Sequence, residues 1–228
     1  GVPMARKGAP SFVTSVGGTL AVKWVGLSAA DRFDKVAGGA VDIECGNTSA
    51  TLSRMERFDF SNLIFVDGGG VLVLADSKIG RLSDLAGKTV VAVAGTTTEQ
   101  SLAAALKNRL IDAKVLPVKD EDEALAALQS GKADGYAADR VKLVVLVVRA
   151  QGEKKLAEKF RLIQEDYSIE PYALMMRRDP AMRLAVNRGL AQLYRSGAIM
   201  EIYDRWLAPL GKPTPLLAAM FILGATPE

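Results

Sequence analysis

The chain has 228 residues, of which 49% are apolar and 24% charged, and its net charge is +3. This is the composition of a globular protein with one large or two small domains, and the charge is too small to indicate nucleic-acid binding. The sequence has no histidine and a single cysteine, Cys45, which excludes histidine-based catalysis, histidine-ligated metals and an internal disulfide. We therefore expect no metal and no cofactor, and we expect Cys45 to pack as a small apolar residue.

The sequence shows neither a signal-peptide pattern nor a transmembrane segment. Its longest apolar runs lie at residues 144–148 and 216–225. Both are shorter than the roughly 20 residues that span a bilayer. We predict that the second run docks on the surface of a domain and does not anchor the chain in a membrane.

The first part of the chain predicts a strand, a helix and a second strand. Residues 19–25 alternate between apolar and polar types, as residues 41–45 do, and such alternation is typical of half-buried strands. Between them, Ser28 and Asp31 have the spacing of a capping box, and the glycines at 38–39 end the helix. This order favours an α/β sheet with parallel neighbours.

A polar loop and an arginine follow the second strand. Residues 46–49 read Gly-Asn-Thr-Ser, and Arg54 lies a few positions later. A guanidinium fork matches both oxygens of a carboxylate, so Arg54 and these donors are a candidate carboxylate receptor. From spacing alone, the better-supported alternative is a surface ion pair between Arg54 and Glu56 or Asp59.

The middle of the chain alternates between strand and helix patterns. Glycines at 68–70 indicate either a hinge between two lobes or a simple loop. Strands are predicted at residues 71–74, 89–94, 114–118 and 133–137. Helices are predicted at residues 96–110, at 120–131 and from residue 140 onward.

Two positions in this region are candidate binding residues. Thr96 and Glu99 have capping-box spacing after a glycine, and the start of such a helix favours anions, but the segment lacks the lysine and glycine spacing of a nucleotide-binding loop. Asp139 follows a predicted strand at its C-terminal end, where ligands bind in open α/β sheets. Asp139 is thus a candidate partner for a ligand ammonium group or, equally, the cap of the next helix.

The last part of the chain predicts a strand and two helices. Residues 172–176 form the strand, Asp179 and Pro180 begin a helix that ends near Ser196, and an amphipathic helix ends near Leu207. The aromatic residues of these helices are expected in the core and not as ligand contacts: Tyr194, Tyr203 and Trp206.

These segments together resemble the family 3 solute-binding proteins of polar amino-acid ABC importers, in particular the glutamate/aspartate-binding branch. The resemblance begins near Gly18 and covers nearly all of the chain after it. The motifs that carry it are, in order, IECGNTS at 43–49 with Arg54, DFSNLIFV at 59–66, GTTTEQ at 95–100, SGKADGYAAD at 130–139, EPYALMMRRDP at 170–180 and SGAIMEIYDRWL at 196–207.

The resemblance implies an α/β fold with two lobes and a hinge, like that of type II periplasmic binding proteins. Lobe one would contain residues 1–66 and 175–228, and lobe two residues 67–174, with crossings near 66–70 and 168–174. The first strand and helix of the family have no match before Thr19. We therefore expect lobe one to be incomplete, with an exposed sheet edge through which the protein could self-associate.

The resemblance also implies the roles of five residues. Arg54 would bind the α-carboxylate of an amino acid, and Ser49 and Asn47 would add hydrogen bonds from the same loop. Thr97, in the other lobe, would hold the same carboxylate, and Asp139 would bind the α-ammonium. Closure of the hinge would bury the ligand between the lobes.

The implied function is that of a periplasmic, non-enzymatic binding component that delivers an amino acid to the membrane permease of an ABC importer. Glycines at 68–70 stand where the glutamate/aspartate branch has polar and basic side chains, and Glu121 stands where a basic residue would suit an acidic ligand. A neutral polar amino acid is thus as well supported as glutamate or aspartate. The alternatives are a truncated, non-binding remnant or interaction module and, with less support, a dehydratase of the same fold that uses Glu170 as its acid.

Overall fold

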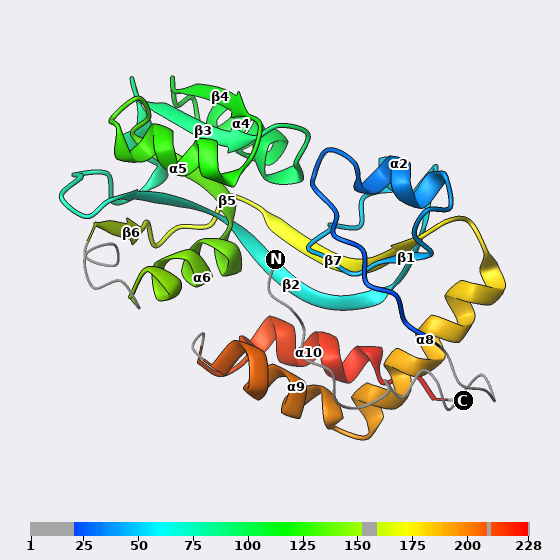
Figure 1. Cartoon of the computed structure of the whole chain (residues 1–228). Coiled ribbons are helices and arrows are strands. Elements are labelled where there is room, and N and C mark those ends of the chain that lie inside the picture. Colours follow the sequence, from blue (N-terminus) through cyan, green and yellow to red (C-terminus); the bar gives the residue numbers. More distant parts are fainter. Residues whose placement is uncertain (1–20, 152–158, 209–210, 228) are drawn as a thin grey trace. The chain divides into compact units, whose positions relative to one another are not determined.

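The computed structural model describes residues 21–151, 159–208 and 211–227. These residues form two compact units, each of which is described by itself. Unit 1 contains the described residues up to Val66 and from Pro171 onward, and unit 2 contains Asp67–Glu170. The chain passes between the units within strand β2 (Asp59–Leu74) and again within strand β7 (Ile169–Met176) (Figure 1). The lobe boundaries and the hinge stay predictions.

Unit 1 combines a short strand pair with helices. Besides its parts of β2 and β7, its described elements are α2 (Arg32–Ala37), β1 (Ile43–Glu44), α3 (Leu52–Met55), α8 (Pro180–Arg195), α9 (Ala198–Leu207) and α10 (Pro215–Gly224). β1 pairs antiparallel with β7, with Ile43 opposite Met176 and Glu44 opposite Met175. The predicted strand at 41–45 thus exists in shortened form, and its neighbour is antiparallel where a parallel one was expected.

The strand predicted at residues 19–25 is wrong over its described part. Residues 21–28 have no regular structure, and Val22 and Trp24 are 52% and 65% exposed. An alternating pattern stabilises a strand only when a sheet buries one face of it. Val22 and Trp24 would form one face and Val25 the opposite face, and all three are exposed. The prediction of an incomplete lobe one also concerns residues 1–20, which lie outside the described residues.

One predicted helix start of unit 1, at Asp179 and Pro180, is confirmed, whereas α2 begins later than predicted, at Arg32 with Asp31 as its N-cap. Ser28 and Asp31 exchange the expected bonds, from Ser28 N to Asp31 Oδ1 at 2.7 Å and from Asp31 N to Ser28 Oγ at 3.2 Å, just before α2. Asp179 Oδ1 accepts bonds from the first backbone amides of α8, and Pro180 is the first residue of that helix. These bonds join residues within one turn, which explains why the sequence predicts them.

Helices α8, α9 and α10 pack together in unit 1 (Figure 1). Their shared apolar cluster consists of Tyr194, Tyr203, Leu217, Met220 and Phe221. This confirms that the apolar run at 216–225 docks on its own domain and that Tyr194 and Tyr203 are core residues. Among the described residues, no helix is long and apolar enough to cross a membrane.

Two further predictions for unit 1 are wrong. Trp206 is 49% exposed, because it lies on the outer side of the amphipathic helix α9. Cys45 is exposed where it was expected to be packed, because β1 ends at Glu44 and the loop that follows leaves the strand pair.

Unit 2 is built on one sheet. Besides its parts of β2 and β7, its described elements are the 3-10 helix η1 (Leu82–Leu85), β3 (Thr89–Val93), α4 (Thr97–Asn108), β4 (Lys114–Val118), α5 (Glu121–Gln129), β5 (Gly135–Asp139), α6 (Arg140–Gln151) and β6 (Phe160–Leu162). β3 lies between β4 and β5 and is parallel to both, whereas β2 is antiparallel to β5 and to β6. The predicted elements of this region, including the helix that begins at residue 140, are confirmed.

One apolar cluster in the core of unit 2 joins the sheet to α4. Among its members are Val71, Val90 and Ala137 from three strands and Leu102 and Leu106 from α4, none of them more than 3% exposed. The glycines at 68–70 belong to β2. They are therefore not the simple loop that the sequence left open as one alternative.

Candidate functional site

In unit 1, the polar loop after β1 is fixed on β7. Thr48 and Ser49 are almost completely buried, and Ser49 forms an isolated β-bridge with Tyr172. The backbone amide of Ala50 donates to the carbonyl of Pro171 at 2.8 Å. The loop is thus held by backbone bonds, while Asn47 lies exposed on its outer side.

Arg54 is held by the same loop. It lies on the short helix α3, where the Thr51 side chain accepts a bond from its backbone amide at 3.3 Å. Its guanidinium donates through Nη1 to the carbonyl of Ser49 at 2.7 Å and lies over the ring of Phe33, 5.0 Å from the ring centre. One edge of the guanidinium is thereby fixed against the loop, so unit 1 brings Arg54 and Ser49 together.

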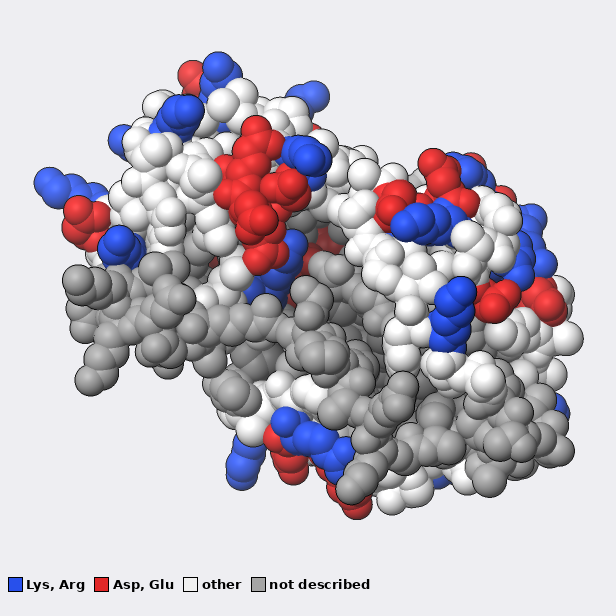
Figure 2. All heavy atoms as spheres, viewed as in Figure 1, with Lys and Arg blue, Asp and Glu red and all other residues white. Residues whose placement is uncertain are grey.

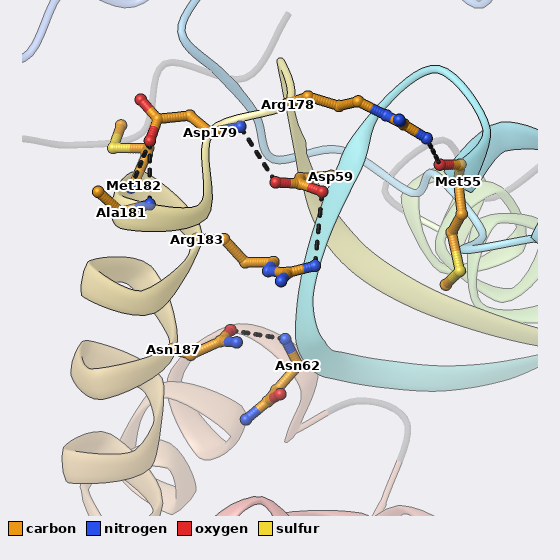
Figure 3. A network of polar contacts seen from close by, with 9 residues as sticks. All are labelled: Met55, Asp59, Asn62, Arg178, Asp179, Ala181, Met182, Arg183 and Asn187. Carbon is orange, nitrogen blue, oxygen red and sulfur yellow. Dashed lines mark hydrogen bonds and ion pairs between the residues drawn. The ribbon is translucent and has the colours of Figure 1, made fainter.

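The alternative partner considered for Arg54, the carboxylate of Asp59, joins β2 to the start of α8 (Figure 3). Asp59 Oδ2 accepts a bond from the backbone amide of Asp179 at 3.1 Å, and Oδ1 pairs with Arg183 Nη1 at 3.4 Å. Nearby, Ser61 Oγ accepts a bond from Leu174 N in β7 at 2.9 Å. The polar residues of the Asp-Phe-Ser triplet are therefore structural ties within unit 1.

In unit 2, Thr97 is the first residue of α4. The preceding Thr96 is the N-cap and accepts a bond from the amide of Glu99 at 3.2 Å, while Glu99 Oε2 accepts one from Gly95 N at 2.8 Å. The predicted helix start is confirmed, with Gly95 in place of Thr96 as the partner of the Glu99 carboxylate. Thr97 Oγ1 donates to Glu170 Oε2 at 2.6 Å.

Asp139 is the last residue of β5 and is 7% exposed. It lies opposite Gly69 in the antiparallel pair of β2 and β5, and α6 begins at the next residue, Arg140. Burial of a carboxylate must be compensated by an opposite charge or by hydrogen bonds, and Asp139 stays a candidate partner for an ammonium group.

Glu170 is a functional candidate that sequence reasoning placed in the crossing strand and otherwise considered as the acid of the dehydratase alternative. It is 1% exposed, and its second oxygen, Oε1, accepts a bond from Ser168 Oγ at 2.7 Å. Ser168 precedes β7, which begins at Ile169, so strand spacing gave no signal for this bond. The bond from Thr97 was not predictable, because that residue lies 73 positions away.

The glycines of β2 allow the segment 166–168 to approach closely. Gly69 donates its amide to the carbonyl of Ser168 at 3.3 Å and accepts a bond from the amide of Tyr167 at 2.9 Å. A Cβ atom at Gly69 would lie 2.5 Å from Ser168 Oγ and 2.5 Å from the Tyr167 ring. The glycines thus leave room for the residues that hold Glu170.

Acidic side chains gather over α5 in unit 2 (Figure 2). Three of them form the first turn of that helix, where negative charge is favoured by the helix dipole. Glu121 also pairs with Lys142 Nζ at 2.9 Å. Its position confirms that Glu121 is a first-turn residue.

The described residues contain no cluster of three or more acidic or cysteine side chains that could hold a metal ion. Burial raises the pKa of the Tyr167 hydroxyl well above its usual value, and the negative charges of Asp139 and Glu170 raise it further.

The fold is shared with solved amino-acid-binding proteins. An ancestral arginine-binding protein bound to arginine superimposes with a TM-score of 0.74 at 23% identity, covering 87% of this chain and 84% of that one. The GluR0 ligand-binding core from Nostoc punctiforme, in complex with L-glutamate, gives a TM-score of 0.68 at 29% identity, covering 86% of this chain and 87% of that one.

The chain belongs to the bacterial extracellular solute-binding proteins, family 3, which match residues 13–209. A curated relative is the L-glutamate/L-aspartate-binding protein of Pseudomonas aeruginosa, 32% identical over 188 residues that cover 82% of this chain. The chain spans 61% of the length of that relative. The family and fold expected from the sequence motifs are thus confirmed.

Proposed function

We propose that this protein binds a polar amino acid outside the cytoplasm and delivers it to the membrane permease of an ABC importer. The observation that carries the proposal is the anchored guanidinium of Arg54, which one hydrogen bond and one aromatic ring hold against a loop of buried hydroxyl residues. An arginine fixed in this way can bind a carboxylate with little loss of side-chain entropy. Membership of a family of solute-binding proteins supports the same role.

Each unit contributes its own residues to this function. In unit 1, Arg54 binds the α-carboxylate, with Ser49 and Asn47 as further hydrogen-bonding groups. In unit 2, Asp139 binds the α-ammonium, and Thr97 is the residue expected from the resemblance to bind the carboxylate. A zwitterionic amino acid carries both the anion that suits Arg54 and the cation that suits Asp139.

The ligand is glutamate, aspartate or a neutral polar amino acid. The Pseudomonas aeruginosa relative carries the name of a glutamate/aspartate-binding protein. Two features speak against a ligand with an acidic side chain. The glycines of β2 offer no side chain that could bind it, and Glu121 in unit 2 is itself acidic. The protein acts without a cofactor and as a binding protein, not as an enzyme, and its partners are the amino acid and the permease. Self-association through a sheet edge stays a prediction.

Calorimetric titration of the chain with L-glutamate, L-aspartate, L-glutamine and L-arginine tests the proposal. We expect binding of at least one of them in the micromolar range or tighter, and Arg54→Ala should weaken it by roughly 30-fold or more, as expected for loss of a charged partner. Arg57→Ala is the matched control, because Arg57 is exposed and lies over Phe58. A parent protein that binds none of the four would support the non-binding alternative, and an Arg54→Ala variant that binds as well as the parent would contradict the carboxylate assignment.

A further inference from the structure

A cap of helix α6 comes from a distant strand. Asp139 directly precedes α6, the position from which an aspartate side chain usually accepts a bond from the second or third backbone amide of a helix. The second amide, that of Val141, donates instead to Asp67 Oδ2 at 3.0 Å. Asp67 lies on β2, 74 positions earlier in the chain. Because a backbone amide has a single proton, one of the two amides that suit a cap at Asp139 is taken by Asp67.

The two basic side chains in the first turn of α6 are bound by other acidic residues. Arg140 follows Asp139 directly in the sequence, and its guanidinium donates through Nε to the carboxylate of Asp166. Lys142 Nζ pairs with Glu121 Oε2 at 2.9 Å. Both cations that the start of α6 could offer to Asp139 therefore have a carboxylate partner of their own.

Strand pairing in unit 2 explains how Asp67 reaches α6. Gly69 of β2 lies opposite Asp139 in the antiparallel pair of β2 and β5, and Asp67 lies two residues before Gly69 on the same strand. Asp139 is 7% exposed. A buried carboxylate gains strongly from a charged hydrogen-bond donor, so an amide or a cation of α6 that turned to Asp139 would compete with the ammonium group of a ligand.

We propose that Asp67 and Asp166 are positioning residues that keep the start of α6 from competing for the carboxylate of Asp139. Asp67 caps the helix, and Asp166 holds Arg140, so that Asp139 serves the ammonium group of the ligand. The inference rests on the proposed amino-acid-binding function, in which Asp139 binds the α-ammonium. The sequence left open whether Asp139 binds an ammonium group or caps α6, and Asp67 takes the second of these roles at Val141.

Removal of the cap from β2 tests the role of Asp67. In Asp67→Ala, the amide of Val141 loses its acceptor, and Asp139 is the carboxylate in the usual capping position. Calorimetry uses whichever of L-glutamate, L-aspartate, L-glutamine and L-arginine binds the parent most tightly, together with its deaminated analogue, which has a hydrogen atom in place of the ammonium. We expect Asp67→Ala to weaken the amino acid by about tenfold and the deaminated analogue by less than about twofold. Asp67→Asn keeps an oxygen that can accept the bond, and its affinity for the amino acid should stay within about threefold of the parent.

Asp120→Ala is the matched control for the loss of a helix cap. Asp120 caps α5 of the same unit and accepts a bond from the amide of Glu123 at 3.0 Å. Its removal should change neither affinity by more than about twofold. Equal losses of the amino acid and its analogue in Asp67→Ala, or an amino-acid affinity equal to that of the parent, would overturn the inference. A parent that binds none of the four amino acids refutes the proposed function and the inference together, whereas a parent that binds normally, with no loss specific to the ammonium in Asp67→Ala, refutes the inference alone.

Asp166→Ala tests the same idea through the cation and does not depend on the folding of Asp67→Ala. Without Asp166, the guanidinium of Arg140 can turn to Asp139 and compete with the ammonium group. We expect the affinity for the amino acid to fall by roughly threefold or more, and Arg140→Ala, added to Asp166→Ala, should restore it. A merely structural role of Asp166 would not be rescued by removal of its partner. A double variant that binds no better than Asp166→Ala would overturn the inference.

Discussion

Units 1 and 2 hold their candidate binding residues by different means. In unit 2, Thr97 begins a helix that packs on the sheet, and Asp139 ends a strand of that sheet. In unit 1, Arg54 lies on a helix of four residues, and its side chain is held by a loop carbonyl and an aromatic ring. Regular elements fix a side chain through the backbone, whereas a loop needs additional bonds to do so. Unit 1 therefore depends more on its tertiary contacts.

The largest effect is expected where unit 1 packs its helices. Phe221 of α10 is 7% exposed and contacts the ring of Tyr194, with 5.6 Å between ring centres. Phe221→Ala leaves a cavity in that cluster and should lower the free energy of unfolding by about 3–5 kcal/mol, measured by urea denaturation. Leu223 of the same helix is 83% exposed, so Leu223→Ala should change it by less than about 0.5 kcal/mol. Equal effects of the two substitutions would contradict the packing of α10.

The next effect tests how unit 2 fixes Glu170. In Gly69→Ala, the new Cβ would lie 2.5 Å from both Ser168 Oγ and the Tyr167 ring, neither of which can move without disturbing buried groups. We expect a loss of about 1–3 kcal/mol in the free energy of unfolding, measured by urea denaturation, together with weaker amino-acid binding.

Gly70→Ala is the control for this substitution. Its nearest atoms would be 3.5 Å away or more, an ordinary contact distance, and the change should be below about 1 kcal/mol. If Gly69→Ala were as harmless as Gly70→Ala, the close approach of residues 167–168 to β2 would not constrain Glu170.

The features that the sequence predicts correctly are local. The side-chain bonds that Ser28, Thr96 and Asp179 accept involve residues within one turn, and the strands of unit 2 are short apolar runs between turn residues. The side chains of these segments determine their structure without help from distant residues. Most of the elements, the family and the candidate residues could therefore be proposed from the sequence.

The features that the sequence does not predict depend on distant contacts. Glycines at 68–70 suggest a break, yet β2 runs through them for 16 residues, because the segment 166–168 fills the space that side chains would take. The alternation at residues 19–25 suggests a strand, yet the described part of it pairs with no other strand and its apolar side chains are exposed. The bond from Thr97 to Glu170 joins residues on different elements, so no spacing rule could reveal it.

The smallest effect concerns the polar ties that unit 1 uses in place of a continuous sheet. The Asp59 side chain is 15% exposed and accepts bonds from Asp179 N and Arg183, whereas that of Asp42 is 77% exposed and pairs with Arg177 at 3.0 Å. Asp59→Asn removes the charge from two acceptor positions and should lower the free energy of unfolding by about 1–2 kcal/mol, because one partner is a backbone amide at a helix start and the other a half-exposed arginine. Asp42→Asn should change the free energy of unfolding by less than about 0.5 kcal/mol, since an exposed pair is screened by water and salt.

Urea denaturation of both variants at low and at high salt separates the two cases, because only a contribution made by exposed charges disappears at high salt. If the loss of unfolding free energy in Asp59→Asn disappeared at high salt, the bonds from β2 to α8 would not stabilise unit 1. Arg54 would then be held by the loop bonds alone.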